Sequence, residues 1–299
     1  MYLFVYGSLR KYEKNHFFLD KATLVSNQAW VIGTLYDTGK GYPTLSNGKQ
    51  RVYGEVYEVN NEIIARIDAL EGYHSENRHN LFERSNMSIH TDEKRVKAYV
   101  YFCENIHKSY IPIASGDWRI SQFFQTPLST IYYFAYGSCM DQERFSIAQV
   151  HHLFQDKVGR GILEGYSMKY CFEVPDGGRG DIVEDGGTTE GVIYQIDKQG
   201  KEYLYMREGV DAGWYRPALI DVVVNEGEMK NVLTFIVIDK KEEKCPPFHY
   251  AREILRGAHP FVSKEYTQSL LNQLKNLKMD EVEIEQIINE LTQLKRSPQ

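Results

Sequence analysis

Apolar and aromatic residues gather in two short runs that have the same surroundings. One run is Tyr2–Tyr6 and the other is Ile131–Tyr136. Each run stops at a Gly-Ser pair, and a charged segment follows. Such runs are typical of buried strands, and a Gly-Ser pair favours a tight turn whose serine caps the next helix. The chain therefore predicts two strand–turn–helix units about 130 residues apart.

Alternating and helical spacings of apolar residues predict the same order of elements after each run. After the first turn we expect a helix at Asn61–Leu70 and strands at Ala29–Tyr36, Gln50–Val59, Leu81–His90 and Arg95–Phe102. After the second we expect helices at Asp141–Gln149 and Lys198–Met206 and strands at Val158–Phe172, Gly191–Ile196, Ala218–Val224 and Asn231–Ile238. The repeated order predicts a tandem duplication, with domains at 1–120 and 131–278.

Other segments have weaker signals. Lys11–Leu24 is a helix candidate, Ile111–Ser129 reads as the domain end plus a linker, and the glycine-rich Pro175–Gly191 favours a mobile loop. The tail predicts helices at Tyr250–Arg256, Lys264–Leu277 and Asp280–Lys295. The last of these, within the tail 279–299, carries an apolar stripe. It indicates packing on one of the domains, with pairing to a second chain as the alternative.

Composition narrows the class of protein. The 299 residues are 42% hydrophobic and 25% charged, the balance of a globular protein with two ordinary domains. A net charge of -6 without a basic block argues against nucleic acid or an anionic membrane as partner. We expect a cytoplasmic protein, since neither a membrane-spanning run nor a signal segment is evident. The four cysteines form no C-x-x-C, which argues against disulfides and a zinc site.

A glutamate before glycine is the second repeated signal. Glu71 follows Tyr6 by 65 residues and Glu208 follows Tyr136 by 72, each at the end of a predicted short helix. The helix dipole and apolar neighbours would raise the pKa of such a carboxyl, which suits a general base. A surface glutamate before a capping glycine is the alternative for either one alone. Its repetition favours a site opposite the turn, whose backbone N–H groups suit a carboxylate or an oxyanion.

Other chemistry is less well supported. Ser8 and Ser138 lack the G-x-S-x-G pattern of a nucleophile. Cys139 is either a nucleophile or a buried thiol, and the first copy has Leu9 there. The glycine-rich stretch lacks the Gly-Lys-Ser/Thr of a phosphate loop, and Tyr250 could reach a pocket or simply pack. Four histidines match no metal-binding spacing, and we expect them at the surface: His74, His79, His151 and His152.

These motifs together resemble the gamma-glutamylcyclotransferase-like family. The first half is similar to the short bacterial and plant members through Tyr6–Arg10, Gly33–Tyr36, Gly41–Pro43, Val52–Tyr57, Ile67–Tyr73 and Ser115–Trp118. The second half is similar to larger members, which act on gamma-glutamyl amino acids, through Phe134–Ser138, Gly191–Tyr194, Arg207–Gly209, Tyr215, Pro246–Tyr250 and Gly257-Ala258. The matches cover most of residues 1–275, so the chain resembles a two-domain bacterial member.

The resemblance implies an α+β fold of two tandem mixed β-barrel domains flanked by helices, with C-terminal helices added. It implies that a gamma-glutamyl amide is converted to 5-oxoproline and a free amine, without metal or cofactor, by a monomer or weak homo-oligomer. Glu71 and Glu208 would be the acid/base groups. The implied substrate contacts are Tyr6, Gly7, Ser8 and Leu9 in the first half, and Tyr136, Gly137, Ser138, Cys139, Met140 and Tyr250 in the second.

Two departures bear on substrate choice. Larger members usually have asparagine where this chain has Cys139, and the usual Tyr-x-Arg after Glu-Gly-Tyr is displaced to Phe82–Arg84. Two other classes of function stay open at this point. One is a small-molecule binding protein in which one or both pockets have lost turnover, and the other is a scaffold that docks through its C-terminal helix.

Overall fold

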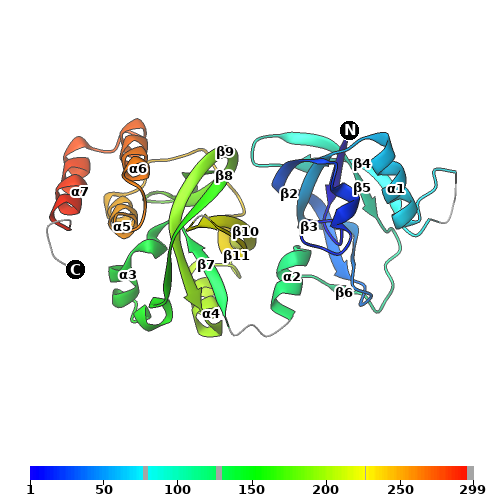
Figure 1. Cartoon of the computed structure of the whole chain (residues 1–299), viewed down its shortest axis with the longest axis horizontal. Helices are drawn as coiled ribbons and strands as arrows, with labels where there is room; N and C mark the ends of the chain where they lie inside the picture. Colours follow the sequence, from blue (N-terminus) through cyan, green and yellow to red (C-terminus); the bar gives the residue numbers. More distant parts are fainter. Residues whose placement is uncertain (77–79, 126–129, 226, 295–299) are drawn as a thin grey trace. The chain divides into compact units, whose positions relative to one another are not determined.

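The protein is described from a computed structural model of the chain (Figure 1). The structure describes residues 1–76, 80–125, 130–225 and 227–294. His79 and the ends of the predicted segments that reach Ser129 and Lys295 lie outside the described residues. The chain divides into two compact units, residues 1–126 and 127–299.

The first unit is a closed barrel with one added strand. Its strands are β1 (Tyr2–Val5), β2 (Thr23–Asp37), β3 (Pro43–Glu58), β4 (Glu83–His90), β5 (Arg95–Phe102) and β6 (Ile111–Pro112). Its helices are η1 (His16–Leu19), α1 (Asn61–Glu71) and α2 (Trp118–Gln125). The order is β3-β1-β5-β4-β2, β3 pairs again with β2 to close the barrel, and β6 extends β2. β1 lies parallel to β5 and antiparallel to β3.

The second unit is also a closed barrel, in the order β10-β11-β7-β9-β8. Its strands are β7 (Ile131–Ala135), β8 (Lys157–Val174), β9 (Gly177–Ile196), β10 (Tyr215–Val224) and β11 (Gly227–Val237). Its helices are η2 (Ser138–Met140), α3 (Gln142–Ile147), η3 (His151–Phe154), α4 (Lys198–Arg207), α5 (Phe248–Ala258), α6 (Lys264–Asn276) and α7 (Glu281–Leu294). β7 lies parallel to β11 and antiparallel to β9.

The two barrels have the same connectivity, strand for strand. β1 to β5 pair with one another as β7 to β11 do, and α1 and α4 each follow the third strand. A close backbone approach is also repeated. A Cβ at Gly54 would lie 2.3 Å from the Val5 carbonyl oxygen, and one at Gly191 would lie 2.2 Å from that of Ala135. The predicted α+β fold of two mixed barrels with flanking helices is therefore confirmed.

The prediction of a helix at Lys11–Leu24 is wrong. The segment consists of turns and the single 3-10 turn η1, and β2 already begins at Thr23. A buried carboxylate competes for the backbone there, since the Lys11 N–H donates to Glu55 Oε2 at 2.9 Å.

The segment Ile111–Ser129, predicted as the end of the first domain plus a linker, contains β6 and α2, which were not predicted, and the first unit ends at residue 126. α2 is held at its start by Asp117, which accepts hydrogen bonds from the N–H groups of Arg119 and Ile120. The helix has only eight residues, too few to give a clear period in the sequence.

The prediction of a mobile loop at Pro175–Gly191 is wrong as well. Almost all of it belongs to β9, a strand of 20 residues. Its glycines let other backbone pass close by: a Cβ at Gly178 would lie 2.4 Å from the carbonyl oxygen of Lys244 and 2.7 Å from that of Tyr170. The glycines here indicate a strand that other backbone approaches closely, not a mobile loop.

The three C-terminal helices form a layer on the second unit (Figure 1). α5 packs on η2, and α7 packs on α5 and α6. α7 buries Ile284, Ile287 and Leu291 of the predicted apolar stripe. Arg252 of α5 pairs with Glu290 of α7 through two contacts of 2.6 and 2.9 Å. The last helix is thus joined to α5 by both apolar packing and charge.

Two further observations bear on the class of protein. Among the residues that the structure describes, none of the helices combines the length and the apolar character that a membrane crossing requires. All four cysteines are free thiols.

We predict that Gly191→Ala destabilises the second unit by about 1–3 kcal/mol, because the new Cβ would overlap the Ala135 carbonyl oxygen. Hydrogen exchange of the β7 and β9 amides measures this loss. Gly227→Ala is the matched control, since its Cβ would meet nothing closer than 3.6 Å. Equal protection in the two variants would contradict the prediction.

Candidate active site

Each unit holds one cavity between the turn after its first strand and the end of its short helix. The first cavity measures about 420 Å³ and is lined by Tyr6, Gly7, Ser8, Leu9 and Glu71 among others. The second measures about 260 Å³, and its lining includes Tyr136, Gly137, Ser138, Cys139, Glu208 and Tyr250. The structure thus brings the predicted turn and the predicted glutamate together in both units. Met140 is fully buried and does not line the second cavity.

A tyrosine anchors each turn to the barrel. The Tyr6 hydroxyl donates to the Tyr101 carbonyl oxygen at 2.8 Å, and the Tyr136 hydroxyl donates to the Phe235 carbonyl oxygen at 2.6 Å. Both acceptors lie on the strand that runs parallel to the first strand of the unit. The hydroxyls are thereby committed to the scaffold, while the rings form part of the cavity wall.

The serines do not cap helices, contrary to prediction. Ser8 Oγ accepts a hydrogen bond from Asn15 Nδ2 at 3.0 Å, and Ser138 Oγ accepts one from Arg207 Nη2 at 2.9 Å. Asp141 caps α3 instead. The reason for glycine at position 7 is space, because a Cβ there would lie 2.6 Å from the Pro43 side chain.

The two turns share one hydrogen-bond pattern. The Arg10 N–H donates to the Gly7 carbonyl oxygen at 2.9 Å, and the Met140 N–H donates to the Gly137 carbonyl oxygen at 3.0 Å. In each turn, the two amides between these bonded residues differ. Within the described residues, the following N–H groups have no protein acceptor: those of Ser8 and Leu9 in the first turn, and those of Ser138 and Cys139 in the second. They are donors available to a carboxylate or an oxyanion.

Buried charges hold the chain just after each turn. Arg10 Nε lies 3.0 Å from Glu55 Oε1, and its Nη1 lies 2.7 Å from Asp117 Oδ1. In the second unit the polarity is reversed, because Asp141 pairs with Arg256 of α5. Removing one partner of such a buried pair leaves an uncompensated charge, so both pairs fix the turns firmly.

Glu71 lies at the end of α1. Asn60 caps the start of this helix, and its end is closed by Gly72 at a φ of 65°. Apolar side chains share the cavity wall with Glu71, including Leu81 and Phe82. Burial raises the pKa of Glu71 to about 7, so the group can both take and return a proton near neutrality.

Glu208 occupies the matching place at the end of α4, before Gly209 at a φ of 61°. Burial raises its pKa, while Arg207 and the Cys139 thiol oppose the rise. The thiol donates to Glu208 Oε1 at 3.5 Å. Burial also raises the pKa of Cys139, so this side chain acts as a buried thiol that orients the carboxylate rather than as a nucleophile.

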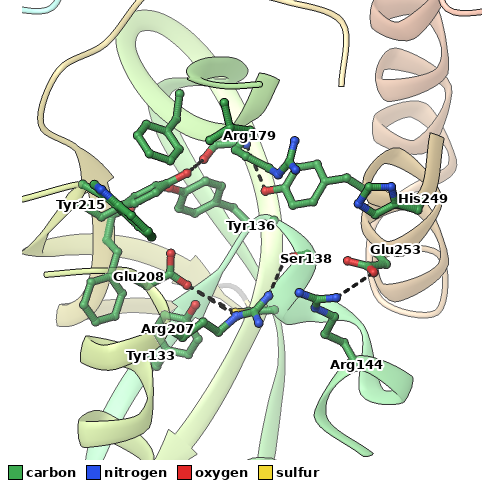
Figure 2. A pocket seen from close by; sticks show the side chains of 18 residues that line it. Tyr133, Tyr136, Ser138, Arg144, Arg179, Arg207, Glu208, Tyr215, His249 and Glu253 are labelled. Atoms are coloured by element: carbon green, nitrogen blue, oxygen red, sulfur yellow. Dashed lines mark hydrogen bonds and ion pairs between the residues drawn. The ribbon is translucent and has the colours of Figure 1, made fainter. Parts of the chain in front are cut away.

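Arginines line the second cavity, and the sequence reasoning missed them: Arg144, Arg179 and Arg207 (Figure 2). Arg207 donates to Ser138 Oγ and, at 3.1 Å, to Cys139 Sγ, which ties α4 to the turn. Its place beside Glu208 was the signal that could have found it. Arg144 has no such signal, because it lies on a short helix outside the repeated motifs.

Tyr250 and Tyr215 close another side of the second cavity around one glycine. The Gly180 N–H donates to the Tyr250 hydroxyl at 3.0 Å, and the Tyr215 hydroxyl donates to the Gly180 carbonyl oxygen at 2.8 Å. The Arg179 guanidinium stacks over the Tyr250 ring at 4.8 Å. Tyr250 therefore reaches the pocket, as one of the two predicted possibilities has it, and its hydroxyl also binds the backbone of β9.

Other singled-out residues lie away from the cavities. Arg84, the displaced arginine, pairs with Asp68 at 2.7 Å and stacks on Tyr73 and Tyr99. The histidines at 74, 151 and 152 line neither cavity. Within the described part of the chain, no group of three or more His, Cys, Asp or Glu side chains is placed to hold a metal ion.

Comparison with known proteins gives matches over both units. Residues 3–120 match the family described as "Gamma-glutamyl cyclotransferase, AIG2-like", and residues 188–270 match the "AIG2-like family". The Bacillus subtilis protein named "Putative gamma-glutamylcyclotransferase YkqA" is 41% identical over 279 residues, which cover 92% of this chain and 98% of that protein. The crystal structure of YkqA superposes with a TM-score of 0.83 over 92% of this chain and 97% of that chain.

One more relative is similar to part of the chain. The Niallia circulans protein named "Gamma-L-glutamyl-butirosin B gamma-glutamyl cyclotransferase" is 39% identical over 118 residues, which cover 39% of this chain and 74% of that protein.

We predict that Glu71→Gln stabilises the first unit at pH 8 and not at pH 4. The folded pKa of about 7 lies above the ordinary value of 4.5. The wild-type free energy of unfolding therefore falls as pH rises from about 4.5 through 7, and glutamine removes this loss. The expected gain at pH 8 is about 1–3 kcal/mol. Hydrogen exchange of the β1–β5 amides measures it. The exposed Glu58 supplies the control Glu58→Gln, and equal effects of the two changes would contradict the prediction.

Proposed function

The chain belongs to the gamma-glutamylcyclotransferase family, and from this premise we propose that each of its units converts a gamma-glutamyl amide to 5-oxoproline and a free amine. The observation that carries the proposal is the repeated meeting of two features in one cavity. In both units a half-buried glutamate faces the same space as a turn whose N–H groups have no acceptor among the described residues.

The first step forms the ring. Glu71 or Glu208 accepts a proton from the α-ammonium of the glutamyl group, and the freed amine attacks the γ-carbonyl carbon. A new C–N bond closes a five-membered ring, and the carbonyl oxygen takes the negative charge. The amides of Ser8 and Leu9, or of Ser138 and Cys139, stabilise that oxygen or hold the α-carboxylate.

The second step breaks the original amide. The protonated glutamate returns its proton to the leaving nitrogen, the C–N bond to that nitrogen breaks, and the carbonyl re-forms. The glutamate then takes the second proton from the ring nitrogen, and the released amine picks that proton up. The products are 5-oxoproline and the free amine, and no water is consumed. Because both reacting groups belong to one molecule, holding the reactive conformer supplies much of the rate, up to ~7–11 kcal/mol in favourable cases.

The raised pKa of both glutamates supports this cycle, because one carboxyl must act first as base and then as acid. The name of the Niallia circulans relative also supports a gamma-glutamyl amide as the substrate. A binding protein without turnover would need the turn donors but no carboxyl poised near neutrality.

We expect Glu71→Gln to lower the turnover of the first unit, and Glu208→Gln that of the second, each by about 10²- to 10⁴-fold. Release of 5-oxoproline from a panel of gamma-glutamyl amino acids and amines is the measurement. Glu62→Gln and Glu202→Gln are controls, since both side chains are exposed on the same helices. Full turnover in the double variant Glu71→Gln/Glu208→Gln would refute the assignment of the bases. Binding of the panel without any release by the wild type would favour the binding protein.

The pH profile of the first unit provides a separate prediction. In the Glu208→Gln variant, kcat/KM should rise through an apparent pKa of about 7 as Glu71 ionises. Between pH 6 and pH 8 the expected rise is about tenfold, which follows from the ionised fraction of one group. A flat profile over this range would be inconsistent with Glu71 as the base.

A further inference from the structure

The second cavity holds an ion pair that the proposed chemistry does not use. Arg144 of α3 and Glu253 of α5 both line it, and Arg144 Nη1 lies 3.1 Å from Glu253 Oε1. The pair lies on the side of the pocket away from Glu208 (Figure 2). The pair therefore faces the same cavity as Glu208 from a separate side, where it can contact a part of the substrate other than the reacting atoms.

The protein does not fill the hydrogen-bonding capacity of this pair. Glu253 Oε2 is buried and accepts no hydrogen bond from the described residues. An unpartnered buried carboxylate oxygen is costly, and native structures rarely leave one without a role. A ligand N–H group is one donor that would satisfy it.

Arg144 is also the least engaged arginine of the cavity. Arg179 donates to both oxygens of Asp176 and to the Gly178 carbonyl oxygen. Arg207 donates to the side chains of the turn. Among the described residues, the Arg144 guanidinium donates to Glu253 alone, and its side chain is 39% exposed. A guanidinium has five N–H donors in a planar fork that matches a carboxylate.

From these observations, and resting on the proposed function, we infer that Arg144 and Glu253 determine the leaving group of the second site. Arg144 binds a carboxylate carried by the leaving amine, and Glu253 holds the guanidinium in place and accepts an N–H group of the same leaving group. The substrate class of this site is then a gamma-glutamyl amino acid or short peptide, rather than a simple gamma-glutamyl amine.

Among the described residues that line it, the first cavity has no arginine, so it serves as an internal reference. Its wall beside Glu71 is apolar, with Leu70, Leu81 and Phe82, and its cation Lys14 is exposed. A change at Arg144 should leave the first site unaffected.

The test compares gamma-glutamylalanine with gamma-glutamylalaninamide, which differ only in the carboxylate. It uses the full chain with Glu71→Gln, so that the second site is measured alone. Arg144→Gln should lower kcat/KM for gamma-glutamylalanine by about tenfold or more, as for a lost hydrogen bond to a charged group. The value for the alaninamide should change by less than about twofold, because that ligand has no charge to lose.

Three further variants sharpen the result. Arg144→Lys keeps the charge without the planar fork and should lose part of the preference. Glu253→Gln removes the carboxylate that holds the guanidinium in place and should lose part of the preference for gamma-glutamylalanine. Arg160→Gln removes an equal charge outside the cavity, where Arg160 lies 3.7 Å from Glu190, and should change nothing. Circular dichroism establishes that each variant is folded.

Failure of this inference can be told apart from failure of the proposed function. Equal effects of Arg144→Gln on the two ligands, in a folded protein that releases 5-oxoproline, would overturn the inference alone. If the wild type releases none, calorimetry with Glu71→Gln/Glu208→Gln still tests it. Tighter binding of gamma-glutamylalanine that Arg144→Gln abolishes would support the inference, and equal binding of the two ligands would overturn it.

Discussion

The hydrogen bond from the turn tyrosine to the parallel neighbouring strand is the constraint on which both sites depend. Tyr6 and Tyr136 each commit a buried hydroxyl to a backbone carbonyl across the barrel. Because the first strand lies between its partners in the closed sheet, that bond sets the position of the Gly-Ser turn relative to the whole barrel. The turn amides and the glutamate at the helix end then face one cavity, because the same barrel positions both.

The two units keep this geometry and support it with different chemistry. After the first turn a cation, Arg10, is held by two buried carboxylates, and after the second an anion, Asp141, is held by Arg256. Each arrangement pairs its buried charges, as burial requires. The linings differ in the same way, apolar beside Glu71 and rich in arginine beside Glu208. Duplication therefore preserved the positions of the reacting groups and left their surroundings free to change.

The sequence revealed the features that are both local and repeated. Tyr-Gly-Ser and Glu-Gly recur with similar spacing, so the strands, the short helices and the pairing of turn with glutamate could be predicted. It misled where one residue type has two meanings, as with the glycines of β9, which allow close backbone contact rather than motion. It gave no sign of α2, which is too short to show a period, or of Arg144 and Glu253, which meet although 109 residues separate them. Such a contact depends on how α5 packs, and no local pattern records that.

The ion pairs between α7 and α5 have a consequence for the order in which the two units fold during synthesis. Glu290 contacts Arg252 and also lies 3.8 Å from Arg256, the residue that holds Asp141 after the second turn. The support of the second turn is therefore complete only when almost the whole chain is present. The first turn draws its support from residues up to Asp117. As a ribosome releases the chain from its N-terminal end, domains fold in order. The first unit can then fold while the second half is still being made, and the contact of Arg256 with Glu290 forms only after α7 has been synthesised.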